Sequence, residues 1–345
     1  MIIVLASGAV YRYIQCVISP DAMTMAQHFL LSTKARTLSL AQVMRLSDDE
    51  AYSQFKAIRF ASNDGEAFCP KCGSLELYNL PRRKMWRCKG CPCQFSVTSG
   101  TIFASRKLSI RDILAAIAIF TNGAKGHSAL QLSRDLDCQY KTAFVLAHKL
   151  REALQAQDKH SQVSGHVEID GMYVGGYVKP ANVKALRRDR RLLANRTGKR
   201  QSVIVARERN GKTITFAAKS EAAAVPMLHD RIATGSTVYA DEASHWDAFH
   251  ASYDTKRINH SEAYSDADCS TNLAESFFSR LRRAEVGTHH HIAGPYLGAY
   301  AAEMDWREDN RRVSNGEQFA MIVAAAAMHP ISRNWKGYWQ RRRAA

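Results

Sequence analysis

Three acidic residues in the second half of the chain have local contexts that could support metal-dependent chemistry. Asp170 and Asp241 each close a short apolar run, in VEIDG and TVYADE, of the kind that forms a β-strand. Glu275 lies within NLAESFFSRLRR, whose apolar residues recur at helical spacing. An aspartate at a strand end is usually only a turn former, so neither aspartate predicts a site by itself. Three carboxylates brought together, however, would bind Mg²⁺, a hard cation that prefers oxygen ligands.

The order of the elements that carry these acids predicts how they could meet. A strand ending at Asp170 is followed by a hairpin around Asn210 and Gly211, a helix, a strand ending at Asp241, and the helix of Glu275. This is the element order of an RNase H-like domain. We therefore predict an α/β fold in which Asp170, Asp241 and Glu275 hold two Mg²⁺ ions, with Mn²⁺ possible in their place. Such a pair of ions activates the attacking oxygen and stabilises the leaving oxygen of a phosphoryl transfer.

The third metal ligand has two candidates on one helix. Asn272 precedes Glu275 by three residues, so both side chains lie on the same helical face. A carboxylate holds Mg²⁺ better than an amide does, and we therefore favour Glu275, with Asn272 as the alternative. Glu168 and Glu242, which are close to the two aspartates in the sequence, are weaker candidates.

Four cysteines form a pattern that predicts a zinc site. Cys69 and Cys72 make one C-x-x-C pair, and Cys88 and Cys91 make a second. Each pair lets two thiolates reach one ion, and four thiolates suit tetrahedral structural Zn²⁺. Cys93 could replace Cys91 as the fourth ligand. Because four sulfurs leave no open coordination position, the zinc would stabilise the fold rather than catalyse a reaction.

The segment GHSALQLSRDLDCQYKTAFVLAHKLREAL predicts two helices joined by a turn at DLDCQ. In a helix-turn-helix, the residues at the start of the second helix contact bases or phosphates, and these are Lys141 and Thr142 here. A plain helical hairpin would show the same pattern. We favour DNA binding because the chain as a whole is strongly basic.

The charge balance points to a polyanionic partner. The 345 residues include 48 Lys and Arg against 32 Asp and Glu, a formal net charge of +16. Contacts between such residues and phosphates supply most of the non-specific affinity for nucleic acid. The basic stretch KALRRDRRLLANRTGKRQS predicts a loop that grips DNA through Arg187, Arg188, Arg190 and Arg191. No uninterrupted apolar run is long enough to span a membrane, so no membrane partner is expected.

The same motifs, taken together and in order, resemble one known family. CPKCG, WRCKGCPCQFSVTSGTIF, EIDGMYVGG, VYADE, NLAESFFSRLRR and EMDWREDNRR are similar to motifs of the insertion-sequence-1595 (ISXO2-like) transposases, which are DDE-type enzymes. The resemblance implies Mg²⁺-dependent cleavage and strand transfer at transposon ends, with Asp170, Asp241 and Glu275 as the acids. It also implies that Arg282, in the basic position after the third acid, contacts a DNA phosphate.

The expected architecture is an RNase H-like catalytic domain preceded by a zinc ribbon and a helix-turn-helix. The chain is expected to divide into a non-native or disordered start (1–35), an N-terminal helical segment (36–65), the zinc ribbon (66–104), the helix-turn-helix segment (105–160), the RNase H-like DDE domain (161–325) and a basic C-terminal tail (326–345).

The expected protein is the transposase of a bacterial insertion sequence, cytoplasmic and associated with the nucleoid. It would act on double-stranded DNA, both transposon ends and target, as a homo-oligomer. The alternative is a non-catalytic zinc-ribbon regulator, or an inactive transposase relic, that binds DNA without cutting it. That alternative does not need the three acids, and their presence favours the enzyme.

Overall fold

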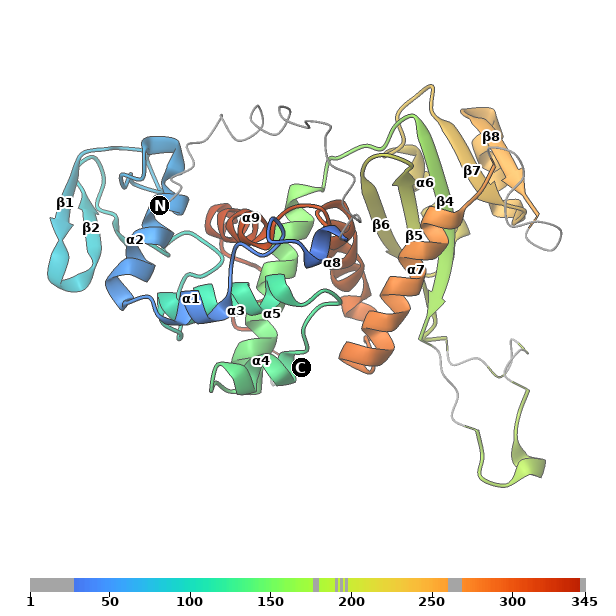
Figure 1. The fold of residues 1–345 in the computed structure, drawn as a ribbon, viewed down its shortest axis with the longest axis horizontal. Helices are drawn as coiled ribbons and strands as arrows, with labels where there is room; N and C mark the ends of the chain where they lie inside the picture. Colours follow the sequence, from blue (N-terminus) through green and yellow to red (C-terminus); the bar gives the residue numbers. More distant parts are fainter. Residues whose placement is uncertain are drawn as a thin grey trace. The chain divides into compact units, whose positions relative to one another are not determined.

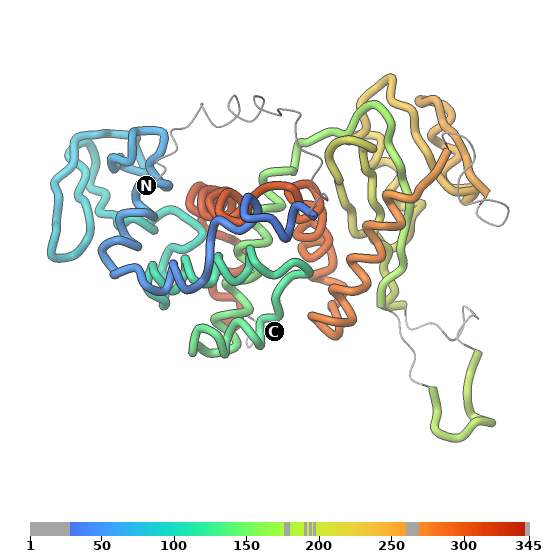
Figure 2. Tube along the Cα trace, in the orientation of Figure 1, coloured from blue at the N-terminus to red at the C-terminus, as the bar shows by residue number. Residues whose placement is uncertain are grey.

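The computed structural model arranges the chain in two compact units. The first combines Met1–Ala156 with Arg311–Ala345, and the second is Gln157–Asn310. Structure is described for residues 28–175, 180–189, 192, 195, 198–259 and 269–341. Figures 1 and 2 follow the chain through each unit. Within the described residues, no helix combines the length and apolar character needed to cross a membrane.

The first unit is built around a buried helix. Its helices are η2 (Phe29–Leu31), α1 (Leu40–Met44), α2 (Asp48–Arg59), η3 (Ala61–Asn63), η4 (Pro81–Arg83), α3 (Ile110–Asn122), α4 (Ala129–Asp135), α5 (Tyr140–Gln157), α9 (Asn315–Met328) and α10 (Tyr338–Arg341). α3 buries residues on nearly every side, as expected of an apolar core helix, and packs against α1, α2 and α9. Ser47 and Ser109 start α2 and α3 with capping boxes.

The chain returns to this first unit through α9. Arg59 of α2 donates a hydrogen bond to the main-chain oxygen of Ala327 at 2.8 Å. The side chain of Asn315 accepts from Leu38 N at 2.9 Å and donates to Leu38 O at 2.7 Å. α9 is rich in apolar residues, and it packs against α2 and α3. It therefore belongs to the first compact unit, whereas the expected catalytic segment extended to residue 325. Residues 1–27 of the expected start lie outside the described residues, and Ala35 is buried.

The zinc-ribbon segment forms a small antiparallel sheet. Its strands are β1 (Leu77–Leu80), β2 (Met85–Cys88) and β3 (Gln94–Ser96), paired in the order β1-β2-β3. Trp86 on β2 stacks with Phe95 on β3 at 5.6 Å and with Tyr52 on α2 at 6.5 Å between ring centroids. These aromatic contacts fix the sheet against α2.

The second unit contains a five-stranded mixed sheet. Its strands are β4 (His166–Val174), β5 (Gln201–Glu208), β6 (Thr213–Ala218), β7 (Thr237–Asp241) and β8 (Asp254–Ile258). Its helices are η5 (Lys184–Leu186), η7 (Ala222–Ala224), α6 (Val225–His229), η8 (Ser244–Ala251), α7 (Asn272–Ala284), η9 (Glu285–His289), η10 (Gly294–Tyr296) and α8 (Leu297–Asp309). The strand order is β6-β5-β4-β7-β8. β4, β5 and β6 pair antiparallel, and β7 and β8 continue the sheet in parallel with β4.

Helices cover both faces of this sheet (Figure 1). Alternating residues of β4 divide between the two faces, with Ile169 in one core and Met172 in the other. The core of Ile169 includes Leu228 of α6 and Trp246 of η8. The core of Met172 includes residues of α7 and α8, among them Phe277. The mixed α/β fold that the sequence predicts is therefore present in this unit.

Candidate functional site

Two neighbouring parallel strands, β4 and β7, carry Asp170 and Asp241. β4 and β7 pair in parallel, with Glu168 opposite Tyr239. The pairing of β4 with β7 ends there; Asp170 lies two residues further along β4, and Asp241, the last residue of β7, lies two residues further along β7. The side chain of Met172 points to the same face of the sheet as that of Asp170, and it packs against α7. Both aspartates therefore lie on the α7 side of the sheet.

The turn after Asp241 is held by an arginine. One Asp241 carboxylate oxygen accepts a hydrogen bond from Ala243 N at 3.2 Å. The guanidinium of Arg257 on β8 donates to the main-chain oxygens of Asp241 at 2.5 Å and of Ala243 at 2.8 Å. It also pairs with Asp247 at 2.7 Å. These contacts restrain the backbone that carries Asp241.

The buried carboxylate of Glu168 holds the start of α7. It accepts hydrogen bonds from Leu273 N at 2.8 Å and Ala274 N at 3.3 Å, and from Arg209 Nε at 3.1 Å. A carboxylate at a helix N-terminus is favourable because the helix dipole is positive there. Glu275 lies in the first turn of α7. Glu168, which the sequence offered only as a weaker ligand candidate, is thus engaged in positioning the helix that carries Glu275.

The environment of Asp170 identifies its acidic neighbours. Burial raises the pKa of Asp170 to about 7, against the opposing effect of a hydrogen bond that it accepts from the Gly171 N–H at 2.7 Å. The carboxylates of Asp241, Glu221 and Glu275 add to the rise, as negative charges near a carboxyl group do. The charges of Asp241, Glu221 and Glu275 therefore act on Asp170, although among the described residues only the four cysteines have ligand atoms that meet closely enough to form a metal-holding group. Crowded carboxylates are the hard oxygen donors that suit Mg²⁺.

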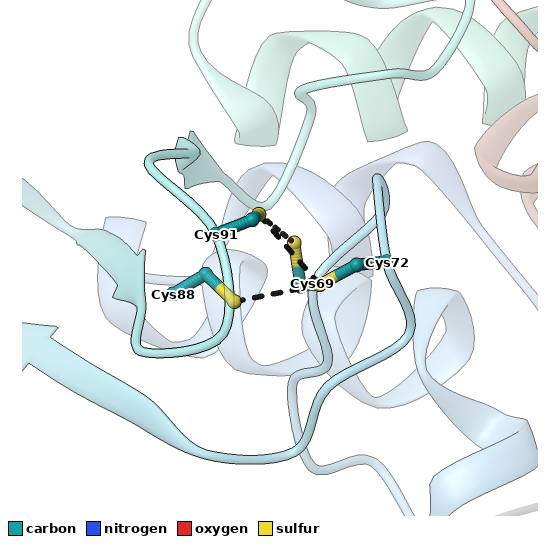
Figure 3. A group of neighbouring side chains, drawn as sticks. All are labelled: Cys69, Cys72, Cys88 and Cys91. Carbon is teal, nitrogen blue, oxygen red and sulfur yellow. Dashed lines mark hydrogen bonds between the residues drawn. The ribbon is translucent and has the colours of Figure 1, made fainter.

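The four predicted cysteines meet in the first unit (Figure 3). The Sγ atoms of Cys69, Cys72, Cys88 and Cys91 all lie within 4.8 Å of one another, and three of the Sγ–Sγ distances are 3.6 Å. Four sulfurs at about 2.3 Å from a tetrahedral zinc ion would be separated by about 3.8 Å. Cys93 is outside this cluster, and its thiol contacts the main-chain oxygen of Gln94. The geometry therefore supports structural zinc with Cys91 as the fourth ligand.

Comparison with protein families matches two segments of the chain. Residues 162–309 match the ISXO2-like transposase domain, and residues 46–94 match the transposase zinc-ribbon domain. The chain carries the two domains of an ISXO2-like transposase. The first match falls within the second compact unit, and the second spans α2 and the four cysteines. No curated protein and no solved structure matches the chain.

The other predicted residues of the transposase domain lie on or near α7 and the β4–β5 connection. Asn272, Glu275 and Arg282 are all exposed on α7. Arg187 and Arg188 are exposed in the segment that leaves the end of β4 and enters β5. Arg190 and Arg191 lie outside the described residues.

The C-terminal segment packs against the predicted helix pair in the first unit. α4 begins after an N-cap at Ser128, and α5 begins at Tyr140. The Lys141 ammonium lies 5.4 Å from the ring centroid of Trp339, and Thr142 is half-buried. The ring of Phe144, one turn along α5, lies 5.9 Å from that of Trp339. Lys141, predicted to contact DNA, therefore already has an aromatic partner within its own unit.

The raised pKa of Asp170 predicts how the stability of the transposase domain depends on pH. In the folded chain the carboxyl holds its proton up to about pH 7, whereas an unfolded aspartate loses it near 3.9. The folded state therefore binds more protons between these values, and the contribution of Asp170 to stability falls as the pH rises from about 4 to 7. Asp170→Asn should stabilise the domain at pH 8 by roughly 1 to 3 kcal/mol relative to the parent, and not at pH 4.

Thermal unfolding in buffer without added Mg²⁺ or Mn²⁺ measures this difference. Burial also raises the pKa of Asp309 to about 7. Asp309 is present in both the parent and the variant, so its contribution to the pH dependence of stability cancels in the comparison. A gain of equal size at pH 4 and pH 8 would show that charge at residue 170 is not the cause.

Proposed function

We propose that the protein is an insertion-sequence transposase that binds the ends of its element and cuts and joins DNA with bound Mg²⁺. The observation that supports the proposal is that Asp170 and Asp241 lie on neighbouring parallel strands, and that the charges of Asp241 and Glu275 act on Asp170. The match of residues 162–309 to a transposase domain supports the same conclusion.

The second unit is proposed to be an RNase H-like domain. Its sheet has three antiparallel strands, β6, β5 and β4, followed by the parallel strands β7 and β8. The first acid lies on the central strand and the second at the end of its parallel neighbour. This is the arrangement expected from the order of elements in the sequence.

Each acid has a defined task in the proposed reaction. Asp170, Asp241 and Glu275 would hold the divalent ions, with Asn272 as the alternative third ligand. When bound, two Mg²⁺ ions supply activation of the attacking oxygen and charge stabilisation of the leaving oxygen. Glu168 and Arg257 keep the backbones of α7 and of the Asp241 turn in place, so the carboxylates need little reorganisation.

DNA would be gripped by basic side chains in both units. Arg282 is exposed on α7 two turns beyond Glu275, where it could bind a phosphate next to the acids. Arg187 and Arg188 extend the basic surface along the β4–β5 connection. In the first unit, the zinc ribbon and the helix pair α4–α5 are proposed to recognise the ends of the element, with the protein acting as a homo-oligomer.

Cleavage of end-containing DNA tests the proposal. The full-length protein is incubated with a plasmid that carries the DNA flanking its own reading frame, with Mg²⁺, Mn²⁺ or Ca²⁺. We expect cuts at the element ends with Mg²⁺ or Mn²⁺. Binding of that DNA without any cut under these conditions would favour the regulator instead.

The β4–β5 connection makes a separate prediction about salt. Each phosphate contact contributes about 0.9 to the slope of log K against log salt. Arg187→Gln with Arg188→Gln should therefore lower the slope by about 1.8, measured by fluorescence anisotropy with labelled duplex. A matched pair, Lys159→Gln with Lys212→Gln, removes two charges from the opposite end of β4 and should leave the slope unchanged. If both double variants lowered the slope by the same amount, specific DNA binding by the β4–β5 connection would be contradicted.

A further inference from the structure

The C-terminal segment, Ser332–Arg341, follows helix α5 from its second half back towards its start. Asn334 donates a hydrogen bond to the Glu152 carboxylate at 3.3 Å. The ring of Trp335 stacks on that of His148, with 4.3 Å between the centroids. These two α5 residues are four positions apart, so both contacts fall on one side of the helix.

The same line of contacts continues to the start of α5. The ring of Trp339 lies 5.9 Å from that of Phe144 and 5.4 Å from the Lys141 ammonium. Tyr338 also packs on Phe144, with 6.2 Å between the ring centroids. The segment and α5 therefore run in opposite directions. Trp339 lies beside the residues with which the helix begins, which are those that the helix-turn-helix prediction directs to DNA.

The C-terminal segment is a folded element rather than a free tail. Trp335 and Trp339 are half-buried, and aromatic contacts of this kind hold two elements together. The Arg341 guanidinium donates hydrogen bonds to the main-chain oxygens of Arg333 at 2.9 Å and of Asn334 at 2.5 Å. These two bonds close the segment on itself, so its side chains are presented from a fixed backbone.

The exposed side of the segment carries only positive charge. Arg333 and Lys336 are exposed, and the sequence has no acidic residue from 329 to 345. Two further arginines follow Arg341, outside the described residues. A segment that blocked a DNA-binding helix by imitating DNA would be acidic. A basic segment instead adds to the attraction for phosphate.

We propose that the C-terminal segment and the start of α5 form one surface that binds double-stranded DNA. Trp335 and Trp339 dock the segment on the helix. Arg333 and Lys336 contact phosphates of the DNA that α5 binds, and Trp339 restrains the Lys141 ammonium by a cation–π contact. This inference rests on the proposed function, in which the helix pair α4–α5 binds the ends of the element. It adds a contact element that the predicted helix-turn-helix does not contain.

The salt dependence of DNA binding tests the inference. In the zinc-loaded full chain, Arg333→Gln with Lys336→Gln should weaken binding of a labelled end duplex and lower the slope of log K against log salt by about 1.8. The control pair, Lys159→Gln with Lys212→Gln, removes two exposed charges from the second unit and should leave the slope unchanged. A parental slope in the first pair overturns the inference. Tighter binding by that pair would show that the segment shields α5 from DNA, and would overturn it as well.

Release of the segment from α5 provides a second test. Trp339→Ala keeps every charge of the chain but removes the ring beside Lys141, and should weaken binding of the end duplex by about threefold or more. Trp339→Phe keeps an aromatic ring and should retain most of the parental affinity. Circular dichroism establishes that each variant is folded. Parental affinity in folded Trp339→Ala would contradict docking as the basis of the contact.

Lys141→Gln distinguishes this inference from the proposed function. If Lys141→Gln weakens binding of the end duplex while Arg333→Gln with Lys336→Gln keeps the parental affinity and slope, α5 binds DNA without the segment. Only this inference is then wrong. If the parent protein itself does not bind the end duplex, the proposed function fails, and the role of the C-terminal segment fails with it.

Discussion

Asp170→Asn and Asp241→Asn should each reduce Mg²⁺-dependent cleavage of element-end DNA by about a thousandfold or more, while binding of the same DNA stays within about twofold. A metal ligand that stabilises transition-state charge contributes several kcal/mol, and each 1.4 kcal/mol corresponds to a factor of ten in rate. Asparagine preserves shape but removes the charge that holds the ion. Gel-based cleavage kinetics and anisotropy titrations measure the two properties separately.

Glu242→Gln is the control for this experiment. Glu242 is exposed and adjacent to Asp241, so it tests whether loss of any nearby acid lowers the rate. Its cleavage rate should match that of the parent. Cleavage retained in Asp170→Asn or Asp241→Asn would refute the assignment of these residues. The same assay on Asn272→Ala and Glu275→Ala decides which of the two is the third ligand, because only that variant should lose cleavage to the same extent.

The second large effect is expected at the zinc ribbon. Cys72→Ser should remove the bound zinc and unfold the ribbon, because structural zinc sites contribute on the order of 10 kcal/mol to the folding of their domains. DNA binding should weaken, whereas Mn²⁺ binding by the second unit should persist. Zinc content by mass spectrometry and limited proteolysis within residues 46–94 measure the change.

Cys93→Ser is the matched control for the zinc prediction. Its thiol is two residues beyond Cys91 and lies outside the four-sulfur cluster, so this variant should retain one zinc per chain. If Cys93→Ser lost its zinc while Cys91→Ser kept it, Cys93 rather than Cys91 would be the fourth zinc ligand. Pure parent protein without zinc would contradict the site altogether.

The sequence predicted those parts of the structure that have a local signature. Paired C-x-x-C turns identify thiolates that must converge, and the structure places these four sulfurs together. The apolar β-run before Asp241 predicted its place correctly, because Asp241 is the last residue of β7, whereas the strand expected to end at Asp170 continues to Val174. The matches to a transposase domain and a zinc ribbon confirm the family resemblance carried by these motifs.

Features that depend on packing between distant segments were not predictable from local patterns. Glu221 stands in an alanine-rich stretch that indicates only a helix start, and its contact with Gly171 follows from the fold of β4 and η7. Glu168 could be taken for a ligand because it is close to Asp170 in sequence, yet it accepts hydrogen bonds from two main-chain N–H groups of α7 and from Arg209. The segment 326–345, predicted as a basic C-terminal tail, carries Trp335 and Trp339, and their packing against Phe144 has no local signature in the sequence.

The long pairing of β4 with β5 has a consequence for the chain that joins the two strands. β4 continues four residues beyond Asp170, and Val174 is paired with Gln201 where the chain re-enters the sheet. These rungs separate the acids from whatever length of chain bridges the two strands. Under the proposed function, changes in the length or sequence of that bridge would alter contacts with DNA without displacing Asp170 from the sheet.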